Sequence, residues 1–258
     1  MDFKDIRFTQ GLNAVQQLYA EKYGIWVPGT VNHTELKYLC FTAEEANSTV
    51  GYTSTLSTPP VIYKSTDGQN WESWDGTSVT LANIGDRIYV YGENSTLSTN
   101  ISTYTNFVMT GLIAASGDVT TLLTKEGTDT LTQRYVFNHL FSGCTSLTSA
   151  PELPATTLSR NCYYSMFSGC TSLTDAPLLP AKDVTVESCY STMFFRCGSL
   201  KHIKVLAENW GAGVYVSHDW VYNVWSSLSD RGIFEKPESL ELPVGRDGIP
   251  NSWTVVNF

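Results

Sequence analysis

The side chains of this chain that could hold a metal or act as nucleophiles are chiefly six cysteines and four histidines. The cysteines include no C-x-x-C pair, so their spacing does not predict a structural zinc site. The histidines, at His33, His139, His202 and His218, have neither H-E-x-x-H nor any other paired spacing. No G-x-S-x-G, Walker A or G-x-G-x-x-G motif occurs. We therefore expect no catalytic residue, cofactor or metal, and we expect His139 to be a solvated histidine.

Two sets of acidic residues could serve in a glycan-processing enzyme, a hypothesis that we disfavour. They are Glu44 with Glu45, and Asp67 with Asp86. A glycosidase holds its two carboxyl groups roughly 5–10 Å apart. Both sets lie in sequence that is typical of turns, which argues against a catalytic pair.

Two tyrosines are the candidate ligand contacts. Tyr104 lies in a predicted loop rich in serine and threonine, and Tyr164 follows Tyr163 but falls off the apolar stripe of its repeat. A tyrosine offers a flat apolar ring with a polar tip, which suits contacts with sugars or proteins. The alternative, that both are ordinary surface tyrosines, stays open.

The composition narrows the range of partners. Sixteen Lys and Arg stand against 25 Asp and Glu, which gives a net charge of −9, so nucleic acid is not an expected partner. No run approaches the roughly 18 apolar residues of a membrane span, so we expect no membrane insertion. Only 16% of the residues are charged, so we expect hydroxyl groups to provide much of the polar surface.

Residues 1–30 form a segment of their own, in which apolar side chains recur at helical spacing. The stripe consists of Leu12, Val15, Leu18, Tyr19 and Tyr23. A helix of about 12 residues is marginal alone in water. It is therefore expected to dock, either on its own domain or on a partner or sister subunits. The segment has no secretory signal pattern.

Residues 31–115 are expected to form a small antiparallel β-sandwich. Short strands are predicted over 36–42, 49–54, 61–65, 77–81, 87–91 and 107–114. They recur at spacings near ten residues and are separated by turn signals, of which Asp67-Gly68 is the strongest. Short strands at this spacing are typical of sandwiches.

Residues 116–208 contain an internal repeat of 26–27 residues. The segment from Phe141 to Leu147 recurs from Phe167 to Leu173 and, degraded, from Phe194 to Leu200. The predicted repeat core consists of Phe141, Cys144, Leu147, Phe167, Cys170, Leu173, Phe194, Cys197 and Leu200. The apolar positions of each unit have a helix-like spacing, which predicts a helical stripe that faces a core.

This repeat accounts for five of the six cysteines. A disulfide needs Cα atoms within about 7 Å, whereas packed helices stand about 8–10 Å apart. We therefore expect buried free thiols instead of bridges. Residues 209–258 are predicted to cap the last repeat with the tryptophans Trp210, Trp220, Trp225 and Trp253.

The unit C-Y-x-x-M-F-x-x-C-x-x-L-x-x-A-P-x-L-P-A, from Cys162 to Ala181, resembles the BspA-type leucine-rich repeat of gut Bacteroidales and their phages. The likeness spans about residues 35–258, through Tyr63–Trp71, Gly85–Gly92, Gly232–Pro237 and Gly248–Val255. This resemblance implies a binding module, without enzymatic activity, on a cell or virion surface. Bacterial members normally carry a signal peptide or lipoprotein cysteine, and their absence here favours a phage protein.

The expected fold class is therefore mixed α and β: an N-terminal helix, a small antiparallel β-sandwich and a short capped leucine-rich-repeat solenoid. The expected function is a non-catalytic component of a phage head or tail fibre that attaches to a host-surface protein or glycan. Residues 1–30 would bind other virion proteins, and a homo-oligomer is expected, with a trimer favoured. The alternative is an adhesin on the bacterial cell surface.

Overall fold

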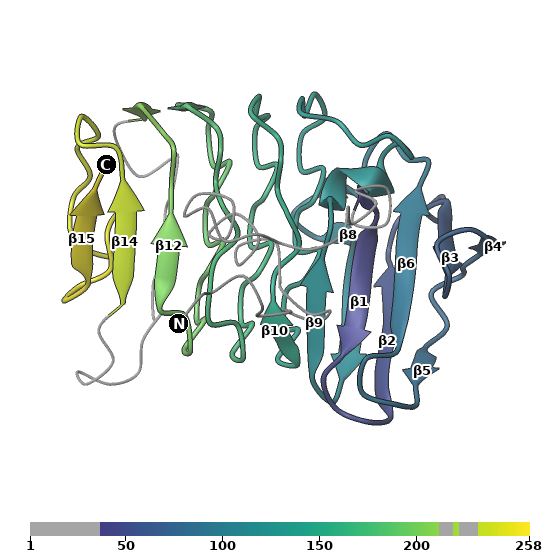
Figure 1. Cartoon of the computed structure of the whole chain (residues 1–258). Coiled ribbons are helices and arrows are strands. Elements are labelled where there is room, and N and C mark those ends of the chain that lie inside the picture. Colours follow the sequence, from purple (N-terminus) through teal and green to yellow (C-terminus); the bar gives the residue numbers. More distant parts are fainter. Residues whose placement is uncertain (1–36, 212–218, 222–231) are drawn as a thin grey trace, which may run out of the picture.

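The computed structural model describes residues 37–211, 219–221 and 232–258 (Figure 1). In these ranges the chain consists of strands, turns and bridges, with one short 3₁₀ helix, η2 (Val119–Leu122), and no α-helix. The predicted fold class, mixed α and β with a leucine-rich-repeat solenoid, is therefore wrong, and the predicted N-terminal helix, with its stripe from Leu12 to Tyr23, lies outside the described residues.

The N-terminal half forms two sheets that are mainly antiparallel. The six-stranded sheet has the order β10 (Leu147–Ser149), β9 (Ile113–Ser116), β1 (Leu39–Ala43), β6 (Arg87–Gly92), β3 (Ile62–Ser65) and β4 (Glu72–Ser73). The four-stranded sheet has the order β5 (Val79–Leu81), β2 (Ser48–Ser54), β8 (Thr103–Thr110) and β7 (Ser98–Asn100). Strands are thus present in each range where the sequence predicted one.

The two sheets meet through aromatic side chains. Buried and more exposed residues alternate along the second half of β8, so Phe107 and Met109 face the core. The Phe107 ring lies 4.9 Å from Phe41 of β1 and 6.4 Å from Trp74. Buried rings of this size bring a large apolar area into the contact between sheets.

The predicted helices are instead runs of tight turns. We call residues 135–144, 161–170 and 188–197 the three repeat segments. In each, every fourth residue has a positive φ, between 51° and 76°. These residues are Tyr135, His139 and Gly143; Asn161, Ser165 and Gly169; and Ser188, Thr192 and Arg196. An α-helix needs right-handed φ at every position, so these segments cannot be helical.

Backbone hydrogen bonds within the segments alternate between two kinds of partner. The Asn138 N–H donates to the carbonyl of Tyr135, three residues back, at 2.8 Å. The neighbouring Phe137 N–H donates to the carbonyl of Cys162 in the next segment, at 2.9 Å. Alternate residues thus close turns and join segments, which satisfies the backbone without helix or regular strand.

The sequence pattern was misleading because a turn that repeats every four residues places apolar side chains four apart, as in Phe137 and Phe141. A helix repeats every 3.6 residues, and over three turns the two periods place nearly the same side chains on the buried face. Hydrophobic spacing alone does not separate them.

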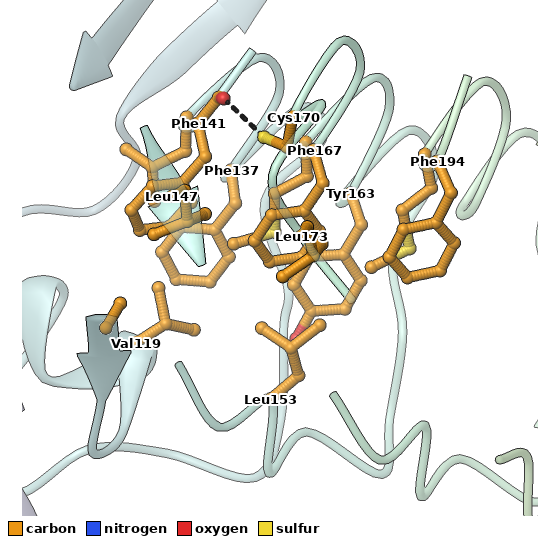
Figure 2. Close-up of a cluster of buried hydrophobic side chains, with 14 of the residues drawn as sticks. Val119, Phe137, Phe141, Leu147, Leu153, Tyr163, Phe167, Cys170, Leu173 and Phe194 are labelled. Atoms are coloured by element: carbon orange, nitrogen blue, oxygen red, sulfur yellow. Dashed lines mark hydrogen bonds between the residues drawn. The ribbon is translucent and has the colours of Figure 1, made fainter. Parts of the chain in front are cut away.

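Two columns of aromatic rings run through the stacked segments (Figure 2). One links Phe107, Phe141, Phe167 and Phe194 with centroid distances of 5.2, 5.4 and 5.8 Å. The other links Phe137, Tyr163 and Tyr190 at 5.8 and 6.0 Å. All nine predicted repeat-core residues are at most 2% exposed. A single buried cluster therefore extends from the sandwich through the repeats.

All six cysteines are buried and free, as predicted for the five in the repeats. The structure adds a role for three thiols. Cys144, Cys170 and Cys197 each donate to the carbonyl of a phenylalanine in the preceding layer, at 3.0–3.1 Å. Figure 2 shows the bond from Cys170 to Phe141. Burial raises the pKa of Cys144 to about 12, so the proton needed for this bond stays on sulfur.

The C-terminal end closes the stack with parallel strands. β12 (His202–Lys204), β14 (Ile233–Lys236) and β15 (Thr254–Asn257) form one sheet, and β11 (Asp183–Val184) pairs with β13 (Asn209–Trp210). Trp220 is buried against Tyr190 and Phe194, with centroids 6.3 and 6.1 Å away. Of the other predicted cap tryptophans, Trp210 and Trp253 pack near this end, and Trp225 lies outside the described residues.

Candidate functional site

Tyr104 and Tyr164, the two candidate ligand contacts, lie on either side of one histidine ring. His139 stacks on Tyr104 with centroids 4.6 Å apart and an interplanar angle of 12°. Its centroid lies 5.8 Å from that of Tyr164. We call Tyr104, His139 and Tyr164 the aromatic row. All three side chains are partly exposed.

The row combines one strand with two repeat segments. Tyr104 belongs to β8 instead of the predicted loop, and its N–H donates to the hydroxyl of Thr55 at 3.0 Å. His139 holds a positive φ in the first segment, and its N–H donates to the carbonyl of Tyr164 in the second at 3.0 Å. The Asn106 amide of β8 donates to the His139 carbonyl at 2.7 Å. Both ends of the row are therefore attached to the same backbone network.

His139 is not the solvated histidine that the sequence predicted. Its Nδ1 lies 2.6 Å from Oδ1 of Asn138, whose buried amide donates to Ser98 Oγ at 3.0 Å. Burial lowers the pKa of His139, which favours the neutral ring at neutral pH. An amide oxygen accepts, so this contact assigns the His139 proton to Nδ1.

The row is suited to binding. Aromatic faces stack on the apolar face of a sugar ring or on another planar group, and the tyrosine hydroxyls supply polar contacts. The Nδ1 of His139 is engaged by Asn138. Sequence spacing could not reveal this arrangement because the turn at His139 decides where that ring points.

The structure also forms an aromatic cluster that the sequence analysis did not identify. Trp71 lies 4.6 Å from Tyr91 and 4.8 Å from Tyr38, and Tyr63 stacks on Tyr91 at 4.8 Å. The Lys125 ammonium lies 5.0 Å from the Tyr91 centroid, which is a cation–π distance. Tyr63 and Tyr91 lie in the predicted strands 61–65 and 87–91, but only the structure shows that β3 pairs with β6 and sets these two residues opposite each other.

The acidic residues of the enzyme hypothesis are engaged in separate local contacts. Asp67 Oδ1 accepts from the N–H groups of Gln69 and Asn70 at 2.8 and 2.7 Å, and these and further bonds hold its pKa far below the usual range. Asp86 accepts from the N–H of Asn83 at 2.9 Å. Glu44 accepts from the hydroxyl of Thr148 at 2.7 Å. Each carboxylate thus stabilises its own surroundings.

A second histidine lies between two carboxylates near the C-terminal sheet. Nε2 of His202 is 2.8 Å from Oε1 of Glu235, and Nδ1 is 3.6 Å from Oδ1 of Asp175. Lys204 contacts the other Glu235 oxygen at 2.7 Å. The contact with Asp175 raises the pKa of His202 and that with Glu235 adds to it, although burial opposes both. The cluster links β12 to β14 and to the preceding repeat.

Among the described residues, no group of three or more His, Cys, Asp or Glu side chains is arranged to hold a metal ion. No helix in that part of the chain has the length and apolar character of a membrane span.

Comparisons of the chain with protein families, curated proteins and solved structures find no match.

Proposed function

We propose that this protein is a non-catalytic attachment protein on the surface of a phage virion, as part of a head or tail fibre. The observation that carries the attachment role is the aromatic row, in which Tyr104, His139 and Tyr164 lie together and partly exposed. A host-surface protein or glycan is the proposed ligand. The virion location rests on the sequence resemblance to repeats found in Bacteroidales phages.

The surroundings of the row support binding in a fixed geometry. Hydrogen bonds between successive segments and the continuous buried core hold the three rings on a shared framework. A preorganised surface loses little conformational freedom when a ligand binds, so more of the contact energy appears as affinity.

Residues 1–30 are proposed to attach the protein to other virion proteins, and the chain is proposed to form a homo-oligomer, with a trimer favoured. Sedimentation of the intact chain tests whether it forms a homo-oligomer. A chain that sediments as a monomer with residues 1–30 present would contradict it.

The attachment role is tested by the binding of labelled protein to Bacteroidales cells. We expect Tyr104→Ala and Tyr164→Ala to weaken binding, and the double variant to weaken it at least tenfold, because each change removes stacking area. Tyr89→Ala is the matched control, since it removes a partly buried tyrosine of β6 that is not part of the row. Unchanged binding by the folded double variant, or an equal loss with Tyr89→Ala, would contradict a role for the row.

A further inference from the structure

The parallel sheet at the C-terminal end of the stack has a free edge. β15 is the last strand in the order β12-β14-β15 and pairs with β14 on one side (Figure 1). In the part of the chain that the structure describes, no strand pairs with its other side. All four residues of β15 are exposed, as is Phe258, which follows it. An unpaired strand edge is a ready site for pairing with another strand.

The hydrogen bonds of β15 show which backbone groups face this edge. The Thr254 N–H donates to the Gly232 carbonyl at 2.9 Å, and the Phe258 N–H likewise donates to a carbonyl of β14 at 3.2 Å. Successive residues of a strand direct their N–H and C=O groups to opposite sides. The groups of Val255 and Asn257 therefore point away from β14, and within the described ranges they have no hydrogen-bond partner.

The edge lacks the features that normally prevent such pairing. Edge strands of natural proteins are commonly protected by charged side chains, especially lysine, or by proline. The segment from Thr254 to Phe258 contains neither. Its side chains include Val255, which is 39% exposed, and Val256, which is 42% exposed. Unpaired backbone groups and exposed apolar side chains thus occur on the same short strand.

Charge favours a second copy of this chain as the partner. Each copy carries a net charge of −9, so two copies repel each other over much of their surface. The edge itself is uncharged. The nearest acid is Glu235, opposite Val256 in β14, and its oxygens are engaged by Lys204 at 2.7 Å and by His202 at 2.8 Å. Two copies can therefore meet along β15 without placing like charges opposite each other.

The edge is also complementary to itself across a two-fold axis at Val256. In an antiparallel pair centred there, Val255 of one copy lies opposite Asn257 of the other, and the two residues exchange backbone hydrogen bonds. Val256 then lies opposite Val256 of the second copy, in the closely spaced kind of pair, where apolar side chains make contact. Each outward backbone group of the strand gains a partner in this register.

The opposite end of the molecule offers no comparable edge. There the six-stranded sheet ends at β4, which has only two residues, Glu72 and Ser73. Glu72 is also engaged in an ion pair with Lys64. A head-to-tail contact between the two ends would build an open filament, whereas a two-fold contact closes on itself. The two edges therefore favour pairing of β15 with its own copy.

We propose that the free edge of β15 is the interface of a two-fold dimer, in which the β12-β14-β15 sheets of two copies join into one sheet. This contact deepens the proposed homo-oligomer by naming a surface for it. It is separate from any contact that residues 1–30 make, and it does not depend on the aromatic row.

Cross-linking of the full chain through Val256→Cys tests the register directly. In the closely spaced kind of antiparallel pair the Cα atoms lie about 4.5 Å apart, which is within disulfide range. We expect mild oxidation to give a covalent dimer that reducing agent separates. The six native cysteines are buried, so they contribute little background. Ile84→Cys is the matched control, since Ile84 is 70% exposed in the β-sandwich and should give no such dimer.

Sedimentation of variants that block the edge gives a second readout. Val256→Lys places two ammonium groups opposite each other, and Val255→Pro removes an outward N–H while leaving the bonds to β14 intact. Each should halve the mass of the assembly, whatever contact residues 1–30 make. Ile84→Lys adds the same charge away from the edge and should leave the mass unchanged.

The proposal is overturned if Val256→Cys gives no cross-link, if Ile84→Cys cross-links equally well, or if both edge variants sediment like the intact protein. A trimer that the edge variants leave unchanged would overturn the β15 interface while supporting a contact through residues 1–30. An intact protein that sediments as a monomer would overturn it as well.

Discussion

At the scale of single residues, backbone conformation decides what the repeat segments are. Gly143 and Gly169 occupy the positive φ that closes each turn, and Arg196 holds the same conformation in the degraded third repeat. Only glycine adopts this region without a steric penalty. Glycine recurs at positions 143 and 169 because it favours this conformation. The spacing of hydrophobic residues carries no information about φ.

Gly143→Ala should destabilise the protein by about 1 kcal/mol through conformation alone, because a Cβ there meets no neighbouring atom but must adopt φ +76°. Gly198→Ala is the matched control, since an added Cβ there also meets no neighbouring atom and the φ of Gly198 is not positive. We expect this control to be neutral or slightly stabilising. Urea unfolding of the two variants measures the difference, and equal losses would contradict the role of backbone conformation.

His202 should make stability depend on pH. Its contacts with Asp175 and Glu235 raise its pKa, so the folded state binds a proton more tightly than the unfolded state. The stabilisation is fully present below the unfolded pKa of about 6.5 and is lost as pH rises through the higher folded pKa. The Tm advantage over His202→Gln should therefore be largest near pH 5.5 and shrink toward pH 8.5. A difference that stays constant with pH would rule this out.

At the scale of elements, the repeat segments behave as layers that share a core. Each segment donates backbone hydrogen bonds to the next, and the phenylalanine column continues from Phe107 of β8 into the repeats. The sheet also crosses the predicted domain boundary, because β10 of the first repeat pairs in parallel with β9. Local sequence could not predict this pairing, since it joins residues that are far apart along the chain.

Leu173→Ala should cost about 2–5 kcal/mol, because the side chain is fully buried between layers and its loss leaves a cavity. Leu178→Ala, in the same repeat, is the control, since that leucine is 44% exposed. Surface changes of this kind typically alter stability by no more than about 0.5 kcal/mol. Chemical denaturation distinguishes the two, and similar losses would contradict the assignment of the core.

At the scale of the whole molecule, the described residues form one body with a continuous interior instead of separate domains. The aromatic row lies where β8 meets the first two repeats. This surface thus belongs to the same scaffold as the buried core.

The six thiols should be protected in the folded protein and free after unfolding. Burial raises the pKa of the repeat cysteines, so little thiolate is available to react at neutral pH. A thiol reagent should therefore label six cysteines in denaturant and react slowly without it. Labelling of four or fewer in denaturant would indicate disulfides and contradict the free-thiol core.

The sequence by itself determined the repeat length, the buried positions such as Phe167 and Leu173, the free cysteines and most strands of the sandwich. These follow from local hydrophobic spacing and turn residues. The tertiary structure decided that the repeats are turns instead of helices, because alternate backbone N–H groups donate to a neighbouring segment, a bond that no segment can make alone. It also decided that Tyr104, His139 and Tyr164 meet, since that contact depends on how layers from distant parts of the chain stack.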